Sequence, residues 1–176
     1  WLQTLQVSPD EESESQKHIA IDGKTLRRSH DRKHGLGPMH IVSAWASDHG
    51  ISLGQVATEE KSNEITAIPQ LLDLIDVEDA IVTIDLAGCQ KAIAAKIVDG
   101  KGDYVFPRKG VHEKLHEDVE FEMLRHIHDD FANCPVSRHI EVEEGHGRLE
   151  ARTYYQITAP SHLRGRSEWK GLKTIG

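Results

Sequence analysis

The sequence has few cysteines, no long apolar run and no surplus of basic residues, and each absence removes a class of protein. Its 176 residues contain two cysteines, Cys89 and Cys134, too few for a disulfide framework or a thiolate zinc site. No apolar run approaches the ~20 residues that a membrane-spanning helix needs. The N-terminal residues WLQTLQVSPDEESESQ have no basic start, apolar segment or cleavage site, so no signal peptide is predicted. We therefore expect a cytoplasmic globular protein.

Acidic residues outnumber basic ones. There are 29 Asp and Glu against 21 Lys and Arg, which gives a net charge of −8 with histidines neutral. This balance argues against a dedicated nucleic-acid-binding surface, which is usually basic. It does not exclude a metal-dependent nuclease, because carboxylates hold the cation and the cation restores positive charge locally. The twelve histidines are many, and their titration near pH 6 would move the net charge toward zero.

Short apolar runs separated by turn residues predict a mixed α/β fold. Strands are expected over residues 19–22, 39–47, 51–58, 80–85, 103–107, 137–144 and 147–158. Helices are expected over residues 62–75, 91–99 and 112–131. Asp48-His49-Gly50 has the composition of a hairpin turn, so the first three strands are expected to form an antiparallel meander. No closing element is expected in the last ten residues.

Single residues and short runs predict further details of three of these segments. The first strand is expected to end at Asp22, because Gly23 follows it. The strand over 80–85 is almost entirely apolar, which is typical of a central strand covered on both faces. Pro69 should kink the helix over 62–75 or mark its true start, because proline lacks the N–H that a helix interior requires.

Two aspartates, Asp22 and Asp85, stand where two of the expected strands end. If those strands are neighbours, the carboxylates meet at one edge of the sheet. Paired carboxylates there could hold two Mg²⁺ or Mn²⁺ ions about 3.5–4 Å apart, an arrangement that cleaves phosphodiesters. The alternative is that both residues only cap turns, a common role for aspartate.

Several segments resemble the H-repeat-associated insertion-sequence (As1-type) transposases, which are bacterial DDE enzymes with a ribonuclease H-like core. The segments are IAIDGKTLR, VSAWAS, EKSNEITAIPQLLDLID, AIVTIDLAGCQKAIAAKIV, GDYVFPRKG, HGRLEAR and WKGLKTIG. Together they cover essentially residues 18–176 in the order of that family. The resemblance implies that Asp22 and Asp85 are the first two members of the catalytic triad and that the cofactor is Mg²⁺ or Mn²⁺.

The resemblance also implies that a part of the enzyme is missing. The family's third carboxylate is a glutamate in a His-Trp-x-Ile-Glu-Asn type motif on a closing C-terminal helix, and no such motif occurs here. Glu150 is the substitute candidate for the third catalytic residue. The chain then divides into a linker or N-terminal remnant (1–17), a partial ribonuclease H-like core (18–110) and a β-containing insertion (111–176). The candidates for contacts with DNA are Lys24, Arg27, Arg28, Lys109, Arg148 and Arg152.

Residues 112–116, HEKLH, match the H-E-x-x-H pattern of zinc hydrolases. Such an enzyme also needs a third protein ligand and a cleft around the helix. With many histidines and glutamates in the chain, a chance match is a real risk, and we interpret HEKLH as coincidental.

Three functions remain open at this point. The first is a DDE transposase whose partners are transposon ends and target DNA, with homo-oligomerisation left undecided and no membrane partner. The second is a catalytically inactive transposase remnant that folds and binds DNA or metal weakly. A zinc metallohydrolase built on HEKLH is a distant third.

Overall fold

Five strands in the first part of the chain form one mixed sheet. The computed structural model describes residues 16–27, 29, 37–58, 64–85, 88–107, 113–145 and 148–176. The strand order is β3-β2-β1-β4-β5. The strands are β1 (Lys17–Thr25), β2 (His40–Ala46), β3 (Ile51–Thr58), β4 (Ala80–Ile84) and β5 (Asp103–Val105). The first three form an antiparallel meander, and β4 and β5 continue the sheet parallel to β1.

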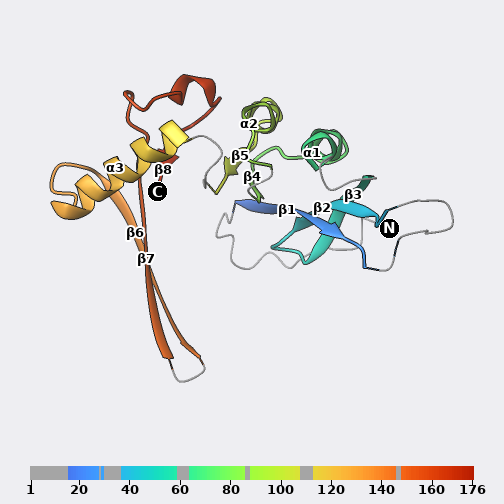
Figure 1. Cartoon of the computed structure of the whole chain (residues 1–176), viewed down its shortest axis with the longest axis horizontal. Coiled ribbons are helices and arrows are strands. Elements are labelled where there is room, and N and C mark those ends of the chain that lie inside the picture. The colour runs from blue at the N-terminus through green and yellow to red at the C-terminus, as the bar shows by residue number, and fades with distance from the viewer. Residues whose placement is uncertain are drawn as a thin grey trace, which may run out of the picture.

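Two helices, α1 (Glu64–Leu72) and α2 (Lys91–Asp99), cover one face of this sheet (Figure 1). Alternate strand residues point into the space beneath them, as the two-residue period of a strand requires. The resulting core is apolar, and burial of such side chains stabilises the fold by roughly 25 cal/mol per Å². Its buried members are Ile19, Ile21, Val42, Ala44, Ala67, Ile68, Leu71, Leu72, Val77, Ala80, Val82, Ile84, Ile93 and Ile97.

The opposite face of the sheet carries a different set of side chains. Ala20, Ile81 and Thr83 are only half-buried there, and Trp45 is 47% exposed. The Nε2 atom of His18 lies 3.0 Å from the Thr83 hydroxyl on this face. The prediction that the strand over 80–85 is buried on both faces is therefore wrong for this chain, since only its alternate residues are fully buried. We call this surface the open face of the sheet.

The second half of the chain builds a long hairpin and a helix. Strands β6 (Val136–Gly145) and β7 (Arg148–Thr158) pair over their full length, and the two-residue strand β8 (Thr174–Ile175) joins β7 at its inner end. Helix α3 (Glu113–His128) lies at the base of the hairpin, whose outer half projects away from the five-stranded sheet (Figure 1). A 3-10 turn, η4 (Arg166–Glu168), lies between β7 and β8.

Residues 159–176, which we call the strap, connect the hairpin to the five-stranded sheet. Three lysine–carboxylate pairs join the strap to α2 and β5: Lys91 with Glu168, Lys170 with Asp99, and Lys173 with Asp103. A second apolar cluster lies beneath it and combines side chains from both halves of the chain. Its buried members are Cys89, Ala94, Leu115, Phe131, Ile157, Ala159, Leu163, Trp169 and Ile175.

The mixed α/β class and its five-stranded sheet with flanking helices confirm the expected architecture. Some boundaries differ. Strand β1 continues past Asp22 to Thr25, because residues 22–25 pair with β2. Pro69 lies inside α1 and not at its start. The strap contains η4 and β8, which the sequence did not predict. Among the described helices, none is long and apolar enough to cross a membrane.

Candidate active site

The C-terminal end of β4 lies beside the middle of β1. The two strands are parallel neighbours in which Ile21 pairs with Ile84. Asp22 follows Ile21 within β1, and Asp85 is the first residue after β4, so the two aspartates follow a pair of neighbouring residues. Adjacent strands are about 4.8 Å apart, which places the two backbones within reach of a common ligand. The register of β1 and β4 therefore places the backbones of the two predicted aspartates near each other; that their carboxylates share a cation stays a prediction.

Asp22 lies on the open face of the sheet, and Asp85 is the exposed first residue after β4. Ile21 and Ile84 are buried under the helices, and the next residue on a strand points to the opposite side. Asp22 and Asp85 are accordingly exposed. Any side chain that completes a site with them must approach from the open face.

The turn that follows Asp85 is tightly packed. The backbone N–H of Gly88 donates to the Asp85 carbonyl at 3.1 Å, and that of Gln90 donates to the Gly88 carbonyl at 2.8 Å. A Cβ atom on Gly88 would lie 2.1 Å from Cγ2 of Ile84 and 2.9 Å from Cδ1 of Ile68. Only glycine fits this position, so the backbone that carries Asp85 is held against the core. The close packing of Gly88 against Ile84 and Ile68 could not be predicted from the sequence.

Comparison with known protein families shows which family this chain belongs to. The family model described as "Transposase DDE domain" matches residues 13–168. The chain belongs to this family of DDE transposases. The resemblance that its motifs suggested is thereby confirmed.

Named relatives agree with the family assignment. The chain is 43% identical over 176 residues to "Putative transposase YncI" of Escherichia coli O157:H7, covering 99% of this chain and 43% of the relative. It is 40% identical over 181 residues to "H repeat-associated putative transposase YhhI" of Escherichia coli K12, covering 99% of this chain and 44% of the relative. The chain thus spans less than half the length of these two relatives.

The described part of this transposase domain contains no group of three His, Cys, Asp or Glu side chains placed to hold a metal ion. Glu150, the candidate third carboxylate, is not brought to the aspartate edge. It lies on β7 opposite Glu143, in the outer half of the hairpin, which projects away from β1 and β4 (Figure 1).

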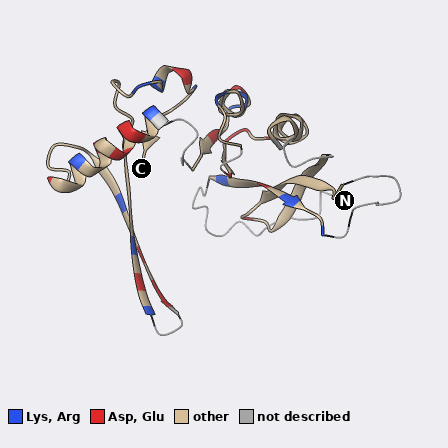
Figure 2. Ribbon diagram, viewed as in Figure 1, with Lys and Arg blue, Asp and Glu red and all other residues tan. Residues whose placement is uncertain are grey.

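The arginine next to Glu150 is held by carboxylates of the same hairpin. Arg152 donates to Glu150 at 2.8 Å and to Glu143 at 3.2 Å. Figure 2 shows acidic and basic residues close together along the hairpin. Arg148 is exposed near its outer end. Arg152, Glu150 and Glu143 therefore form a network of charged side chains on the surface of the hairpin.

The remaining candidates for DNA contacts fall near β1 or outside the described residues. Lys24 follows Asp22 by two positions, so it shares the open face, and both Lys24 and Arg27 are exposed. Arg28 and Lys109 lie outside the described residues. So does His112 of HEKLH, while His116 lies in the first part of α3. The interpretation of HEKLH as coincidental stays a prediction.

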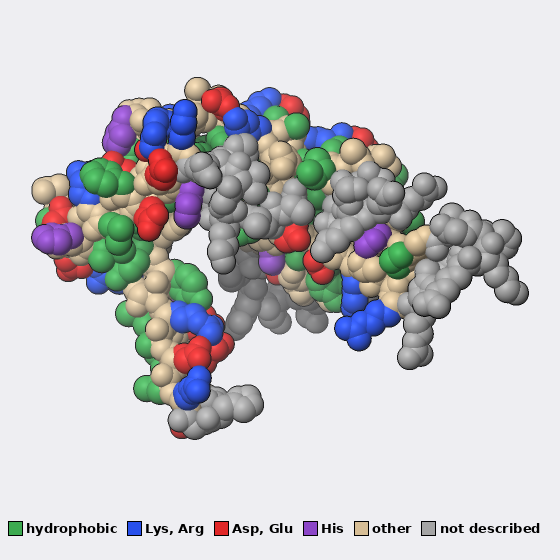
Figure 3. Space-filling view, in the orientation of Figure 1, with side chains coloured by type: hydrophobic (Ala, Val, Ile, Leu, Met, Phe, Trp, Pro, Cys, Tyr) green, Lys and Arg blue, Asp and Glu red, His purple; other side chains and the backbone are tan. Residues whose placement is uncertain are grey.

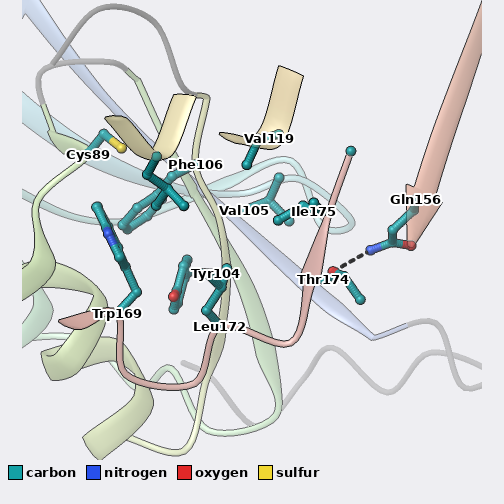
Figure 4. Close-up of a pocket in the computed structure, with 12 residues that line it drawn as sticks. Cys89, Tyr104, Val105, Phe106, Val119, Gln156, Trp169, Leu172, Thr174 and Ile175 are labelled. Carbon is teal, nitrogen blue, oxygen red and sulfur yellow. Dashed lines mark hydrogen bonds between the residues drawn. The ribbon is translucent and has the colours of Figure 1, made fainter. Parts of the chain in front are cut away.

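A separate cavity of about 330 Å³ lies between β5, α3 and the strap (Figure 4). Aromatic rings form much of its wall: Tyr104 and Phe106 have ring centroids 4.7 Å apart, and Phe106 meets Trp169 edge-on at 6.5 Å. The Tyr104 hydroxyl is buried without a hydrogen-bond partner among the described residues. Its burial, with a smaller effect from nearby Cys89, raises the pKa of Tyr104 to about 12. No sequence motif pointed to this cavity.

Proposed function

We propose that this chain carries the metal-binding edge of a DDE transposase that cleaves and joins DNA strands in the cytoplasm. The observation that supports this proposal most directly is the placement of Asp22 and Asp85 directly after Ile21 and Ile84, which pair on two parallel strands. The family assignment supplies the reaction class, and a DDE domain implies dependence on divalent cations in general. DNA, as transposon end and target, would be the partner.

The donor set fits a hard divalent cation. Carboxylate oxygens are the ligands that Mg²⁺ and Mn²⁺ prefer, and both aspartates are exposed to an incoming ion. When bound, such ions would activate the attacking oxygen and stabilise the leaving oxygen of a phosphodiester. Asp22 and Asp85 would hold the ions. Lys24, on the same face, would contact a DNA phosphate and position the strand.

A second candidate function is favoured by one observation. Mg²⁺ requires near-ideal octahedral coordination by oxygen, and the described residues place no third His, Cys, Asp or Glu side chain beside the two aspartates. A chain with this pair alone would bind cations and DNA weakly without turnover. We therefore propose that cleavage needs a third carboxylate delivered to the open face, and that the 176-residue chain by itself does not transpose DNA.

Mn²⁺ binding to the purified chain, measured by titration with electron paramagnetic resonance, tests the metal edge directly. Asp22→Asn and Asp85→Asn should each weaken binding severalfold, because each removes one of the paired carboxylates. Asp73→Asn is the matched control, since Asp73 is an exposed carboxylate that pairs with Lys96 on the helical side of the sheet. Equal binding by all three variants and the wild type would rule out the proposed edge.

Strand cleavage separates the two candidate functions. DNA carrying the element's ends is incubated with the chain and Mn²⁺, and nicked products are resolved on denaturing gels. We expect no nicking by the chain alone. Nicking that disappears in Asp22→Asn and Asp85→Asn would show that the described carboxylates suffice. If nicking also disappeared in Glu150→Gln, Glu150 would be a catalytic residue as well.

A further inference from the structure

The two faces of the β6–β7 hairpin differ in chemistry. Cross-strand pairing places Ile140 opposite Thr153 and Val142 opposite Ala151, on the same side as Leu149. Ile140 and Val142 are each 59% exposed and Leu149 is 71% exposed. The other side carries the pairs His139 with Tyr154, Glu141 with Arg152, and Glu143 with Glu150. The outer half of the hairpin is therefore a ribbon with one apolar and one polar face.

The apolar face is covered only at its inner end. There the Phe131 ring stacks on Tyr155 at 5.0 Å, and Ile157 is buried in the second apolar cluster. Farther out, Ile140, Val142 and Leu149 are exposed, and Figure 3 shows hydrophobic side chains along the projecting hairpin. An isolated two-stranded ribbon is marginally stable in water, so a further layer on this face would stabilise it.

Nucleic acid does not suit this face. The ribbon over 136–158 contains three arginines and four glutamates, a net charge of −1. Two of the glutamates already engage Arg152. A phosphate backbone would meet a negatively charged ribbon and an apolar surface, whereas DNA-binding surfaces concentrate Lys and Arg.

The charges on the apolar face are instead complementary to the same face of another copy. Arg138 and Glu144 lie three residues to either side of Glu141 on β6, and both share the apolar side. Tyr155 and Leu149 lie three residues to either side of Arg152, the cross-strand partner of Glu141, on β7. Consider a two-fold axis that lies between the two apolar faces and runs parallel to the line from Glu141 to Arg152. Such an axis would set Arg138 against Glu144 of the second copy.

The same axis gives apolar contacts in the middle and keeps existing bonds. Ile140, Val142, Ala151 and Thr153 would fill the centre, and the exposed Leu149 would lie toward the inner end of the second copy's hairpin. Arg138 already donates to Asp130 at 2.6 Å through Nη2, but a guanidinium has five N–H donors and can bond a second carboxylate. We infer that the apolar face of the β6–β7 hairpin is a self-association surface that binds the same face of a second copy of this chain.

The contact area sets the expected strength. A ten-residue strand is roughly 33 Å long and a two-stranded ribbon is about 10 Å wide. The area of one face is therefore roughly 330 Å², less than the ~800 Å² that each partner buries in a stable interface. The association should thus be weak and depend on protein concentration.

Sedimentation velocity of the 176-residue chain over a wide range of concentration tests the inference. A reversible dimer is expected. Val142→Asp should weaken dimerisation about tenfold or more, because it places a charge in the apolar centre. Ser137→Asp is the matched control: it adds the same charge on the polar face of the same strand and should leave dimerisation unchanged. Circular dichroism checks that both variants fold.

Charge exchange identifies the partner surface. Arg138→Glu and Glu144→Arg should each dimerise less than the wild type, because like charges then face each other. An equimolar mixture of the two variants should regain dimers, because opposite charges face each other again in the mixed pair. A monomer at every concentration, a dimer insensitive to Val142→Asp, equal weakening by Ser137→Asp, or no recovery in the mixture would overturn the inference.

Discussion

Arg164 clasps Asp118 with its side chain and its backbone. The guanidinium donates to both carboxylate oxygens of Asp118 through Nε and Nη2, and the backbone N–H of Arg164 donates to Oδ2 at 2.8 Å. The same guanidinium reaches the Lys114 carbonyl at 3.2 Å. These bonds join the strap to the first half of α3. They also hold the pKa of Asp118 below its ordinary value.

Arg164→Ala should loosen the strap from α3. Amide hydrogens in the first half of α3 should then exchange faster, as measured by mass spectrometry, while those of β1 and β4 stay protected. Arg164→Lys should recover part of the protection, because lysine keeps the charge but not the two-pronged geometry. Equal exchange in Arg164→Ala and the wild type would mean that the clasp does not hold the helix.

Glu122 should make the contact between α3 and the strap sensitive to acid. Burial alone would raise its pKa, but hydrogen bonds from Arg125 and His162 outweigh burial and lower it. His126 also lies beside it, at 3.8 Å. A lowered pKa in the folded state gives stability that is present above the unfolded pKa of about 4.5 and is lost as pH falls through the folded pKa.

Glu122→Gln tests this linkage. At pH 7 the free energy of unfolding of the variant should be about 1–2 kcal/mol lower than that of the wild type, because the variant loses charge-assisted hydrogen bonds. The difference from the wild type should shrink as the pH falls below about 4.5. Urea unfolding at a series of pH values measures it, and a difference that stays constant into the acid range would contradict the assignment.

Gly88→Ala should be destabilising, although alanine in place of glycine lowers the entropy of the unfolded chain. The new methyl group would overlap Ile84 and Ile68, and overpacking of this kind typically costs about 1–3 kcal/mol. Because Ile84 precedes Asp85, Mn²⁺ affinity should fall as well. Gly37→Ala is the control, since nothing lies within 4 Å of a Cβ there. A Gly88→Ala protein as stable as Gly37→Ala would contradict the packing described for this turn.

Leu71→Ala should lower stability by about 2–5 kcal/mol, because Leu71 is completely buried between α1 and the sheet. Leu74 is two residues beyond the end of α1 and 69% exposed, so Leu74→Ala should change stability by less than about 0.5 kcal/mol. Thermal or urea unfolding followed by circular dichroism compares the two. Similar losses from both substitutions would mean that α1 does not pack as described.

Periodicity and turn composition were sufficient to predict most of the fold. Strand β3 and helix α2 were predicted at their observed bounds because Gly50, with its positive φ, and Gly100 mark where the chain turns. The two-residue strand β8 carries no alternation, so no pattern could predict it. Burial of β4 on one side only depends on which elements reach the open face, and hydrophobicity alone does not contain that information.

The candidate site was predicted in part for a similar reason. Asp22 and Asp85 were each expected where a strand ends, and motif resemblance put them together in one site. Asp85 does follow the end of β4, but Asp22 lies inside β1. Glu150 was proposed from residue type and alternation, which say nothing of where a hairpin points. The cavity around Tyr104 and Trp169 depends on long-range packing between β5 and the strap, and no short motif encodes it.

The three ion pairs of the strap have a consequence for how this chain can change over evolution. They fix the base of the hairpin to α2 and β5, while the outer half contributes nothing to the cluster beneath the strap. Residues could be added to or removed from the outer half in cross-strand pairs without moving the base. The length of the hairpin can thus differ between related transposases while the positions of Asp22 and Asp85 stay the same.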